Sequence, residues 1–329
     1  MRDHGGNLDA AQARFGGTDW IDLSTGINRQ PYPVPNLPTS VWTDLPTASA
    51  TSALTETAQA AFDTRAPVLA LAGAQAAIQL VPRLLAPGHA AVLTPTYNEH
   101  AASLRNAGWQ VAETDRLAGL AGADLAVVVN PNNPDGRAQS RADLLALAQD
   151  VGCLVVDESF IEATPHLSLA AHAGDRVIVL RSFGKFWGLA GLRLGFVLAS
   201  KAHIARLSDM AGPWPVSGAA LELGRIALAD TAWQEATIQR LRQDSQRLDE
   251  LAQQAGWQLV GGTALFRTYA TPDASQAQAG LAEARIWSRI FPYSAQWLRL
   301  GLPGTPAEWA RLAKALAWVS RCRAPRQPA

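Results

Sequence analysis

Short apolar runs alternate with helical patterns between about Pro67 and Ser200. The runs that predict strands are Val68–Leu71, Ala91–Leu93, Leu125–Val129, Leu154–Val156, Val177–Leu180 and Gly195–Ala199. Several of these runs are continuously apolar, as strands are when both faces of their sheet are covered. Helical patterns lie between them, among them Ala74–Leu85 and Ser140–Asp150. This alternation predicts the α/β class with a mostly parallel central sheet.

The pattern changes after Pro213-Trp214-Pro215. A helical stretch covers residues 217 to about 255, with a break at Asp230-Thr231. Strand-like segments follow at Ala264–Tyr269 and Trp297–Leu300, and a last helix begins at Pro306. The proline-rich segment from Asn28 to Pro46 has no periodicity, which predicts an extended arm. We expect an N-terminal arm over residues 1–45 that is part of a small domain, a large domain over residues 46–215, and an interdomain helix with the small α+β domain over residues 216–329.

Composition excludes several classes of protein. The 329 residues include 28 Lys+Arg and 28 Asp+Glu, and 48% of them are apolar. A disordered chain would be less hydrophobic and more highly charged. A net charge of zero gives no electrostatic signature of a nucleic-acid or membrane partner. The two cysteines, Cys153 and Cys322, are too few for a disulfide framework or a cysteine-based zinc site, and we expect no metal. The first residues lack the apolar stretch of a signal peptide, so we expect a cytoplasmic location.

A lysine, a serine and an arginine surround the turn after the run Val177–Leu180. Lys185 follows this buried run within a stretch rich in glycine and apolar residues. An apolar setting lowers the pKa of a lysine and so favours the neutral amine that attacks aldehydes. Ser182 and Arg193 add a hydroxyl and a guanidinium, which suit a phosphate dianion.

The spacing Ser182-x-x-Lys185-x(7)-Arg193-x-Gly195 resembles the lysine site of fold-type I pyridoxal 5'-phosphate (PLP) enzymes, and among them the class I and II aminotransferases. The resemblance implies an aspartate-aminotransferase-like large domain, PLP bound at Lys185 with Ser182 and Arg193 at its phosphate, and a homodimer. Such a dimer would also suit a chain with 11 tryptophans.

Further motifs occur in the order that this resemblance requires. Asp157 ends a buried strand and is implied to pair with the pyridine nitrogen, which keeps the ring an electron sink. Asn133, in the motif Asn-Pro-Asn-Asn-Pro-Asp-Gly, is implied to donate to the O3′ oxygen of PLP and to lie near the substrate. Tyr97 is the candidate that stacks on the pyridine. The candidate phosphate-binding helix start is Gly73-Ala74-Gln75.

Three positions depart from the usual pattern of aminotransferases. Phe160 stands where a tyrosine supplies a hydrogen bond to O3′, so that bond is missing here. Asp135 replaces the threonine of the usual Asn-Pro-Thr-Gly motif, and Gly26 stands where some relatives have an asparagine near the substrate. The first departure argues against an ordinary transaminase without affecting PLP binding.

The N-terminal segment resembles the threonine-phosphate decarboxylases of cobalamin (vitamin B12) biosynthesis. The matching stretches are His4–Asn7, Asp22–Asn28, Thr96–His100 and Trp297–Pro303. His4, Gly5 and Asn7 are thereby implied to bind a substrate phosphate through side-chain donors and open backbone amides. Arg299 is implied to bind the substrate α-carboxylate, and Arg289 to hold the distal phosphate, with Arg285 as a competitor for that role.

The implied substrate is a small phosphorylated amino acid, and the implied reaction is decarboxylation of L-threonine O-3-phosphate to (R)-1-amino-2-propanol O-2-phosphate. A histidinol-phosphate aminotransferase is the alternative enzyme, in which Lys185 would instead remove the Cα proton. The sequence does not measure which bond at Cα breaks. A PLP-binding regulatory module would need an attached DNA-binding segment and a basic patch, which the balanced charge does not favour.

Overall fold

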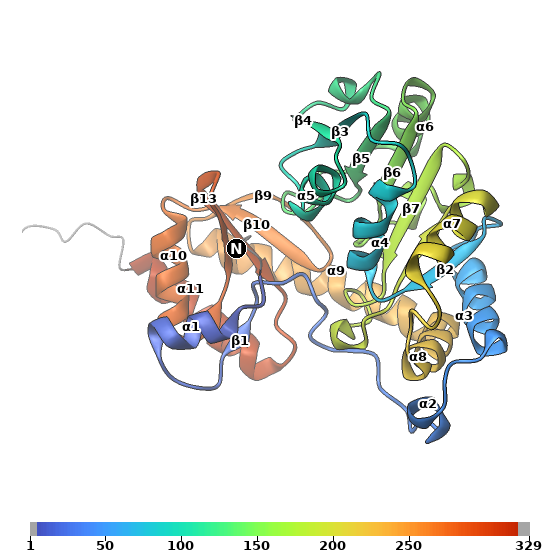
Figure 1. Cartoon of the computed structure of the whole chain (residues 1–329). Helices are drawn as coiled ribbons and strands as arrows, with labels where there is room; N and C mark the ends of the chain where they lie inside the picture. Colours follow the sequence, from blue (N-terminus) through green and yellow to red (C-terminus); the bar gives the residue numbers. More distant parts are fainter. Residues whose placement is uncertain (1–4, 322–329) are drawn as a thin grey trace, which may run out of the picture. The chain divides into compact units, whose positions relative to one another are not determined.

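The computed structural model of the chain describes residues 5–321, which form two compact units. Within the described residues, unit 1 comprises the chain up to residue 30, residues 134–136 and the chain from residue 236 onward. Unit 2 comprises Pro31–Asn133 and Arg137–Glu235. Each unit has its own sheet and its own helices (Figure 1).

Unit 2 is built on a seven-stranded sheet. In spatial order its strands are β2 (Val68–Leu71), β8 (Gly195–Leu198), β7 (Val177–Ser182), β6 (Cys153–Asp157), β5 (Leu125–Val129), β3 (His89–Leu93) and β4 (Gln110–Thr114). Strand β8 runs in the direction opposite to the other six strands. The predicted α/β class with a mostly parallel sheet is therefore confirmed.

Helices surround this sheet (Figure 1). They are α2 (Ser40–Thr43), α3 (Ala48–Ala61), α4 (Ala74–Leu80), α5 (Glu99–Asn106), α6 (Arg141–Asp150), α7 (Lys201–Ala211) and α8 (Gly218–Ala229). Every residue of β5 and β6 is buried, so both faces of the sheet are covered at its centre. This burial explains why these strands appear in the sequence as continuous apolar runs.

Two local features of the structure differ from what the sequence predicts. The pattern Ala74–Leu85 predicts one helix, whereas α4 ends at Leu80 and a 3₁₀ turn follows over Val81–Arg83, where Pro82 has no amide hydrogen to continue the helix. Strand β4 lies at the sheet edge with no buried residue, so the sequence offers no apolar run to predict it. Its pairing with β3 defines it.

Unit 1 contains a four-stranded antiparallel sheet in the order β12 (Arg289–Phe291), β13 (Ser294–Gly301), β10 (Phe266–Ala270) and β9 (Gln258–Thr263). A short parallel pair joins β1 (Ile21–Asp22) to β11 (Ile286–Trp287). The helices α1 (Leu8–Phe15), α10 (Ala274–Glu283) and α11 (Pro306–Arg321) complete this α+β arrangement, and α10 contacts α1, α11 and β13. Helix α9 (Thr231–Gln254) begins in unit 2 and continues in unit 1.

The compact units and the predicted domains divide the chain at different residues. Residues 31–45 and 216–235 belong to unit 2, whereas the sequence assigns them to the arm and to the C-terminal part. Helix α8 packs against α3 and α2, which ties both segments to the larger sheet. The functional boundaries at residues 45/46 and 215/216 stay a prediction. Within residues 5–321, no helix combines the length and the apolar character that crossing a membrane would require.

Candidate active site

Three predicted phosphate-binding segments meet at one edge of the sheet of unit 2. Strand β8 begins at Gly195, which pairs both with Leu71 at the end of β2 and with Ser182 at the end of β7. Gly73 follows β2, and Arg193 precedes β8. Because the carboxyl ends of β2 and β7 lie beside the amino end of β8, the strand register brings these segments together.

Gly73 lies beside the guanidinium of Arg193. A Cβ atom at Gly73 would stand 2.7 Å from Nη2 of Arg193, and the φ angle of Gly73 is +81°, a conformation that favours glycine. A Cβ atom at Gly195 would stand 2.3 Å from the amide nitrogen of Ala74, so this close approach also requires glycine. A guanidinium, backbone amides and the buried Ser182 are donors that suit a phosphate group. The residues of this edge therefore fit the phosphate of PLP.

Asp157 ends β6 at the same edge of the sheet and is buried. Its Oδ2 lies 2.8 Å from Nε2 of His100, and its Oδ1 accepts hydrogen bonds from the amide (3.0 Å) and the hydroxyl (2.5 Å) of Ser159. Burial by itself raises the pKa of Asp157, but the hydrogen bonds and charge of His100 and the bonds from Ser159 lower it below the usual value. A buried carboxylate held ionised in this way suits a protonated pyridine nitrogen.

His100 has no assigned role in the sequence-based prediction, and the structure places it against that carboxylate. It lies on the first turn of α5 and is buried. Its ring is perpendicular to that of Tyr97, with the centroids 6.2 Å apart. The spacing of three residues between Tyr97 and His100 at the start of a helix is the signal that could have revealed this pair.

Gln75 contacts side chains of the neighbouring loop. Its Oε1 accepts a hydrogen bond from the Tyr97 hydroxyl at 3.1 Å, and its Nε2 donates to Oε2 of the buried Glu99 at 3.3 Å. These bonds fix the position of the Tyr97 ring. The roles of Gln75 at the phosphate and of Tyr97 on the pyridine stay predictions.

Two asparagines of the motif Asn130–Gly136 form hydrogen bonds that hold the neighbouring loops. Asn130 bonds through both side-chain atoms to the backbone of Gln139. Asn132 accepts a hydrogen bond from the Thr96 hydroxyl at 2.6 Å and donates to the carbonyl oxygen of Pro95 at 2.8 Å. The loop after β5 is thereby tied to the loop that carries Tyr97. Asn133 is half-buried between these anchored positions, and its contact with O3′ stays a prediction.

Lys185 lies half-buried in the segment after β7, and its neighbours along the chain include buried aromatic residues. Phe183 stacks on Trp187 with ring centroids 4.5 Å apart, and Phe186 meets Trp187 edge-on at 5.1 Å. All three rings are buried, which agrees with the apolar setting inferred for the lysine. Phe160, the departure from the usual tyrosine, is also buried.

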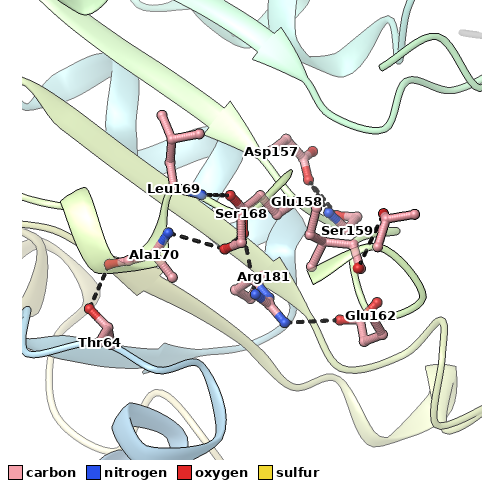
Figure 2. A network of polar contacts seen from close by, with 11 residues as sticks. Thr64, Asp157, Glu158, Ser159, Glu162, Ser168, Leu169, Ala170 and Arg181 are labelled. Carbon is pink, nitrogen blue, oxygen red and sulfur yellow. Dashed lines mark hydrogen bonds and ion pairs between the residues drawn. The ribbon is translucent and has the colours of Figure 1, made fainter. Parts of the chain in front are cut away.

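Arg181 on β7 binds two carboxylates in a buried cluster, one of them that of Glu158, the residue after Asp157 (Figure 2). Its Nη1 lies 3.2 Å from Oε2 of Glu158, and its Nη2 lies 3.4 Å from Oε1 of Glu162. Glu158 also accepts hydrogen bonds from the Ser168 hydroxyl and the Leu169 amide, both at 2.6 Å. Burial raises the pKa of Glu158, and it raises that of Glu162 to about 7. The cluster joins the loop after Asp157 to β7 immediately before Ser182.

In unit 1, two predicted substrate-binding arginines are cross-strand neighbours. Arg299 on β13 pairs in register with Arg289 on β12. Burial and the nearby charge of Arg289 lower the pKa of Arg299 to about 10. Both guanidinium groups lie over the ring of Phe291. Two adjacent guanidinium groups, one of them buried, suit an anionic ligand.

Arg285, the competitor of Arg289, is engaged elsewhere in unit 1. Its Nη1 donates to the carbonyl oxygen of Thr18 at 3.4 Å, and a Cβ atom at Gly17 would stand 1.1 Å from that same nitrogen. This contact with the loop after α1 favours Arg289 as the candidate for the distal phosphate.

Of the N-terminal candidates, Gly5 lies against Ser24 in unit 1. His4 lies outside the described residues. Gly5 packs so closely on Ser24 that a Cβ atom at Gly5 would stand 2.5 Å from the Ser24 carbonyl oxygen. The side chain of Asn7 caps α1, because its Oδ1 accepts a hydrogen bond from the Ala10 amide at 3.1 Å. The substrate roles of all three residues stay predictions.

The sequence is similar to known proteins over most of its length. The model of the family "Aminotransferase class I and II" matches residues 37–316. Threonine-phosphate decarboxylase from Pseudomonas aeruginosa is 43% identical over 96% of this chain and 97% of its own length. Threonine-phosphate decarboxylase from a Sinorhizobium species is 44% identical over 95% of this chain and 97% of its own length.

The fold also matches solved structures. Histidinol-phosphate aminotransferase from Sinorhizobium meliloti, solved in complex with pyridoxal 5'-phosphate, has a TM-score of 0.80 at 21% identity, with 97% of this chain and 95% of that chain covered. This likeness confirms the fold expected from the lysine motif. The chain belongs to the aminotransferase class I and II family.

Proposed function

We propose that the chain is a PLP-dependent decarboxylase that converts L-threonine O-3-phosphate into (R)-1-amino-2-propanol O-2-phosphate, a linker precursor in cobalamin biosynthesis. The observation that carries this proposal is the likeness, over nearly the whole chain, to two bacterial threonine-phosphate decarboxylases. Each unit supports it separately. Unit 2 has residues that fit PLP, and unit 1 has paired arginines that suit an anionic group.

The cofactor side of the site consists of residues of unit 2. Lys185 binds PLP, and Arg193, Ser182 and the Gly73-Ala74-Gln75 turn hold its phosphate. Asp157 stays ionised and keeps the pyridine nitrogen protonated, while Asn133 and Tyr97 bind the ring. When bound, PLP supplies an electron sink for the electron pair that remains at Cα after CO2 departs.

Arginines of unit 1 bind the two anionic groups of the substrate. Arg299 binds the α-carboxylate with two parallel hydrogen bonds, the geometry that a guanidinium favours. Arg289, His4, Gly5 and Asn7 bind the distal phosphate. Anchoring that phosphate orients the carboxylate so that the Cα–carboxylate bond breaks, and Lys185 Nζ then delivers a proton to Cα.

Histidinol-phosphate aminotransferase is the second candidate function. In that reaction Lys185 would remove the Cα proton. The apolar Phe160 lacks the hydroxyl that aminotransferases place at this position, which favours decarboxylation.

We also propose that the protein is a cytoplasmic homodimer without a nucleic-acid partner. Exposed apolar side chains support an interface between copies, because large apolar groups on a surface often mark an interaction site. In unit 2, Trp42 and Leu45 are 68% and 65% exposed. Light scattering coupled to size-exclusion chromatography should give twice the mass of one chain, and a monomer would contradict this proposal.

One assay tests the catalytic proposal. The purified protein with PLP and L-threonine O-phosphate should release CO2 without forming a keto acid. Formation of glutamate from 2-oxoglutarate and histidinol phosphate would instead establish the aminotransferase. If neither reaction occurs although PLP binds at Lys185, the proposed activity is wrong.

A further inference from the structure

Ser24 is the point at which the N-terminal segment and Arg299 meet in unit 1. Its side chain is fully buried. The Ser24 hydroxyl accepts a hydrogen bond from the amide of Gly6 at 2.7 Å, and its carbonyl oxygen accepts one from Nη2 of Arg299 at 2.6 Å. One residue thus contacts both the glycine segment and the predicted carboxylate-binding arginine.

The orientation of Ser24 is fixed by Asp22. Oδ1 of Asp22 accepts hydrogen bonds from the Ser24 amide at 2.9 Å and from the Ser24 hydroxyl at 2.6 Å. Because the hydroxyl donates its only hydrogen to Asp22, a lone pair of its oxygen is directed to the amide of Gly6. The carboxylate therefore sets the polarity of the contact with the N-terminal segment.

The backbone around Ser24 is held on both sides. The amide of Leu23 donates to the Trp287 carbonyl oxygen at 2.8 Å, and the Leu23 carbonyl oxygen accepts from the Gly301 amide at 2.7 Å. Leu23, the residue before Ser24, is thus attached to β11 and to the end of β13, the strand that carries Arg299. A change at the Ser24 hydroxyl should leave this backbone framework in place.

Gly5 contacts the same residue without room for a side chain. A Cβ atom at Gly5 would stand 2.5 Å from the carbonyl oxygen of Ser24 and 3.2 Å from its hydroxyl oxygen. Only a glycine allows the backbone to lie this close. The Gly5-Gly6 pair is thereby seated on Ser24 by one hydrogen bond and by close packing.

We propose that Ser24 is a positioning residue that seats the Gly5-Gly6 backbone for the substrate phosphate while its carbonyl oxygen orients Arg299 for the carboxylate. This inference rests on the proposed function, in which Gly5 and Arg299 contact the substrate. The Ser24 hydroxyl determines the affinity for the phosphate-bearing substrate. The Ser24 carbonyl oxygen orients Arg299, which binds the substrate carboxylate.

The substitution Ser24→Ala separates these two contacts, because it removes the hydroxyl and keeps the carbonyl oxygen on Arg299. In the PLP-loaded full chain, we expect the dissociation constant for L-threonine O-phosphate to rise about tenfold or more, since a hydrogen-bonded anchor is lost. The constant for L-threonine, which lacks the phosphate, should change less than about twofold. Both constants can be measured from the change in PLP absorbance on binding.

Hydrogen exchange gives a readout that does not depend on turnover. In the ligand-free Ser24→Ala protein, the amide of Gly6 should exchange faster than in the wild type. Ser200→Ala is a matched control, because this serine caps α7 in unit 2, and it should leave both dissociation constants unchanged.

The outcomes distinguish this inference from the proposed function. Equal weakening for both ligands, or no weakening for L-threonine O-phosphate, would overturn the role of Ser24. A wild type that binds L-threonine O-phosphate but releases no CO2 would refute the decarboxylase, while the binding comparison would still decide on Ser24. A wild type that does not bind this ligand would overturn both.

Discussion

The Nε2 atom of His100 lies 2.8 Å from Oδ2 of Asp157, and both side chains are buried. The carboxylate stays ionised because this contact and the bonds from Ser159 outweigh the effect of burial. In the proposed site this carboxylate pairs with the pyridine nitrogen of PLP. We therefore expect His100 to influence PLP through Asp157 without touching it.

Replacement of His100 by phenylalanine should raise the pKa of Asp157, because fewer hydrogen bonds then oppose the effect of burial on this pKa. The depressed pKa of Asp157 stabilises the folded protein above the ordinary carboxyl range, and this contribution is lost as pH falls through the folded pKa. In His100→Phe the acid limb of kcat/KM should move to higher pH. The rate should fall about tenfold to a hundredfold, as expected for a lost hydrogen bond to a charged group.

Two variants control this experiment. His100→Gln retains an N–H donor and should recover part of the rate. His166→Phe changes an exposed histidine and should leave the pH profile unchanged. An unaltered acid limb in His100→Phe would contradict the coupling between the two residues.

Substitution of Lys185 by alanine should abolish the absorbance band of lysine-bound PLP. The rate of CO2 release should fall by about 10²–10⁴ or more, because the proton donor at Cα is lost as well. Lys201→Ala, at the exposed start of α7, is the matched control and should keep both signals. Persistence of the band in Lys185→Ala would refute the assignment of the lysine.

Replacement of Glu162 by glutamine should change how stability depends on pH. Burial raises the pKa of Glu162 to about 7 from an ordinary value of 4.5. The folded protein then binds more protons than the unfolded chain between these values, so Glu162 makes the free energy of unfolding decrease as pH rises through this window. The decrease is on the order of 2–3 kcal/mol.

Urea unfolding of the apoprotein between pH 5 and pH 8 measures this effect. Glu162→Gln should be stabilised relative to the wild type at pH 8 more than at pH 5. Glu56→Gln, at an exposed position of α3, should show the same pH dependence of the free energy of unfolding as the wild type. Parallel curves for Glu162→Gln would show that the carboxyl group does not titrate in this range.

Conversion of Arg299 to lysine should weaken substrate binding while it keeps the positive charge. A lysine cannot form the two parallel hydrogen bonds of a guanidinium, and it loses the bond to the Ser24 carbonyl oxygen in the present geometry. We expect KM for L-threonine O-phosphate to rise about tenfold to a hundredfold, corresponding to roughly 1.4–2.8 kcal/mol.

The PLP absorbance should persist in Arg299→Lys, because the proposed cofactor residues are elsewhere in the chain. Arg206→Lys, on an exposed face of α7, provides the comparison and should leave KM unchanged. A loss of PLP binding in Arg299→Lys would show that this arginine does not act on the substrate alone.

The sequence by itself determined the α/β class and the family. Continuous apolar runs such as Leu125–Val129 predict buried strands because helix-covered strands have no solvent-facing side. The spacing of Ser182, Lys185 and Arg193 indicates the lysine site because these residues lie close together in the sequence. Both signals are short in sequence, so a single chain reveals them.

The tertiary structure decided the contacts between segments that lie far apart in the chain. His100 and Asp157 are 57 positions apart, and Ser24 and Arg299 are 275 positions apart. No local pattern specifies such pairs, because strand register and loop packing bring them together. For the same reason the pKa of Glu162 rises to about 7 only when the fold buries this side chain, an effect that exceeds the opposing charge of Arg181.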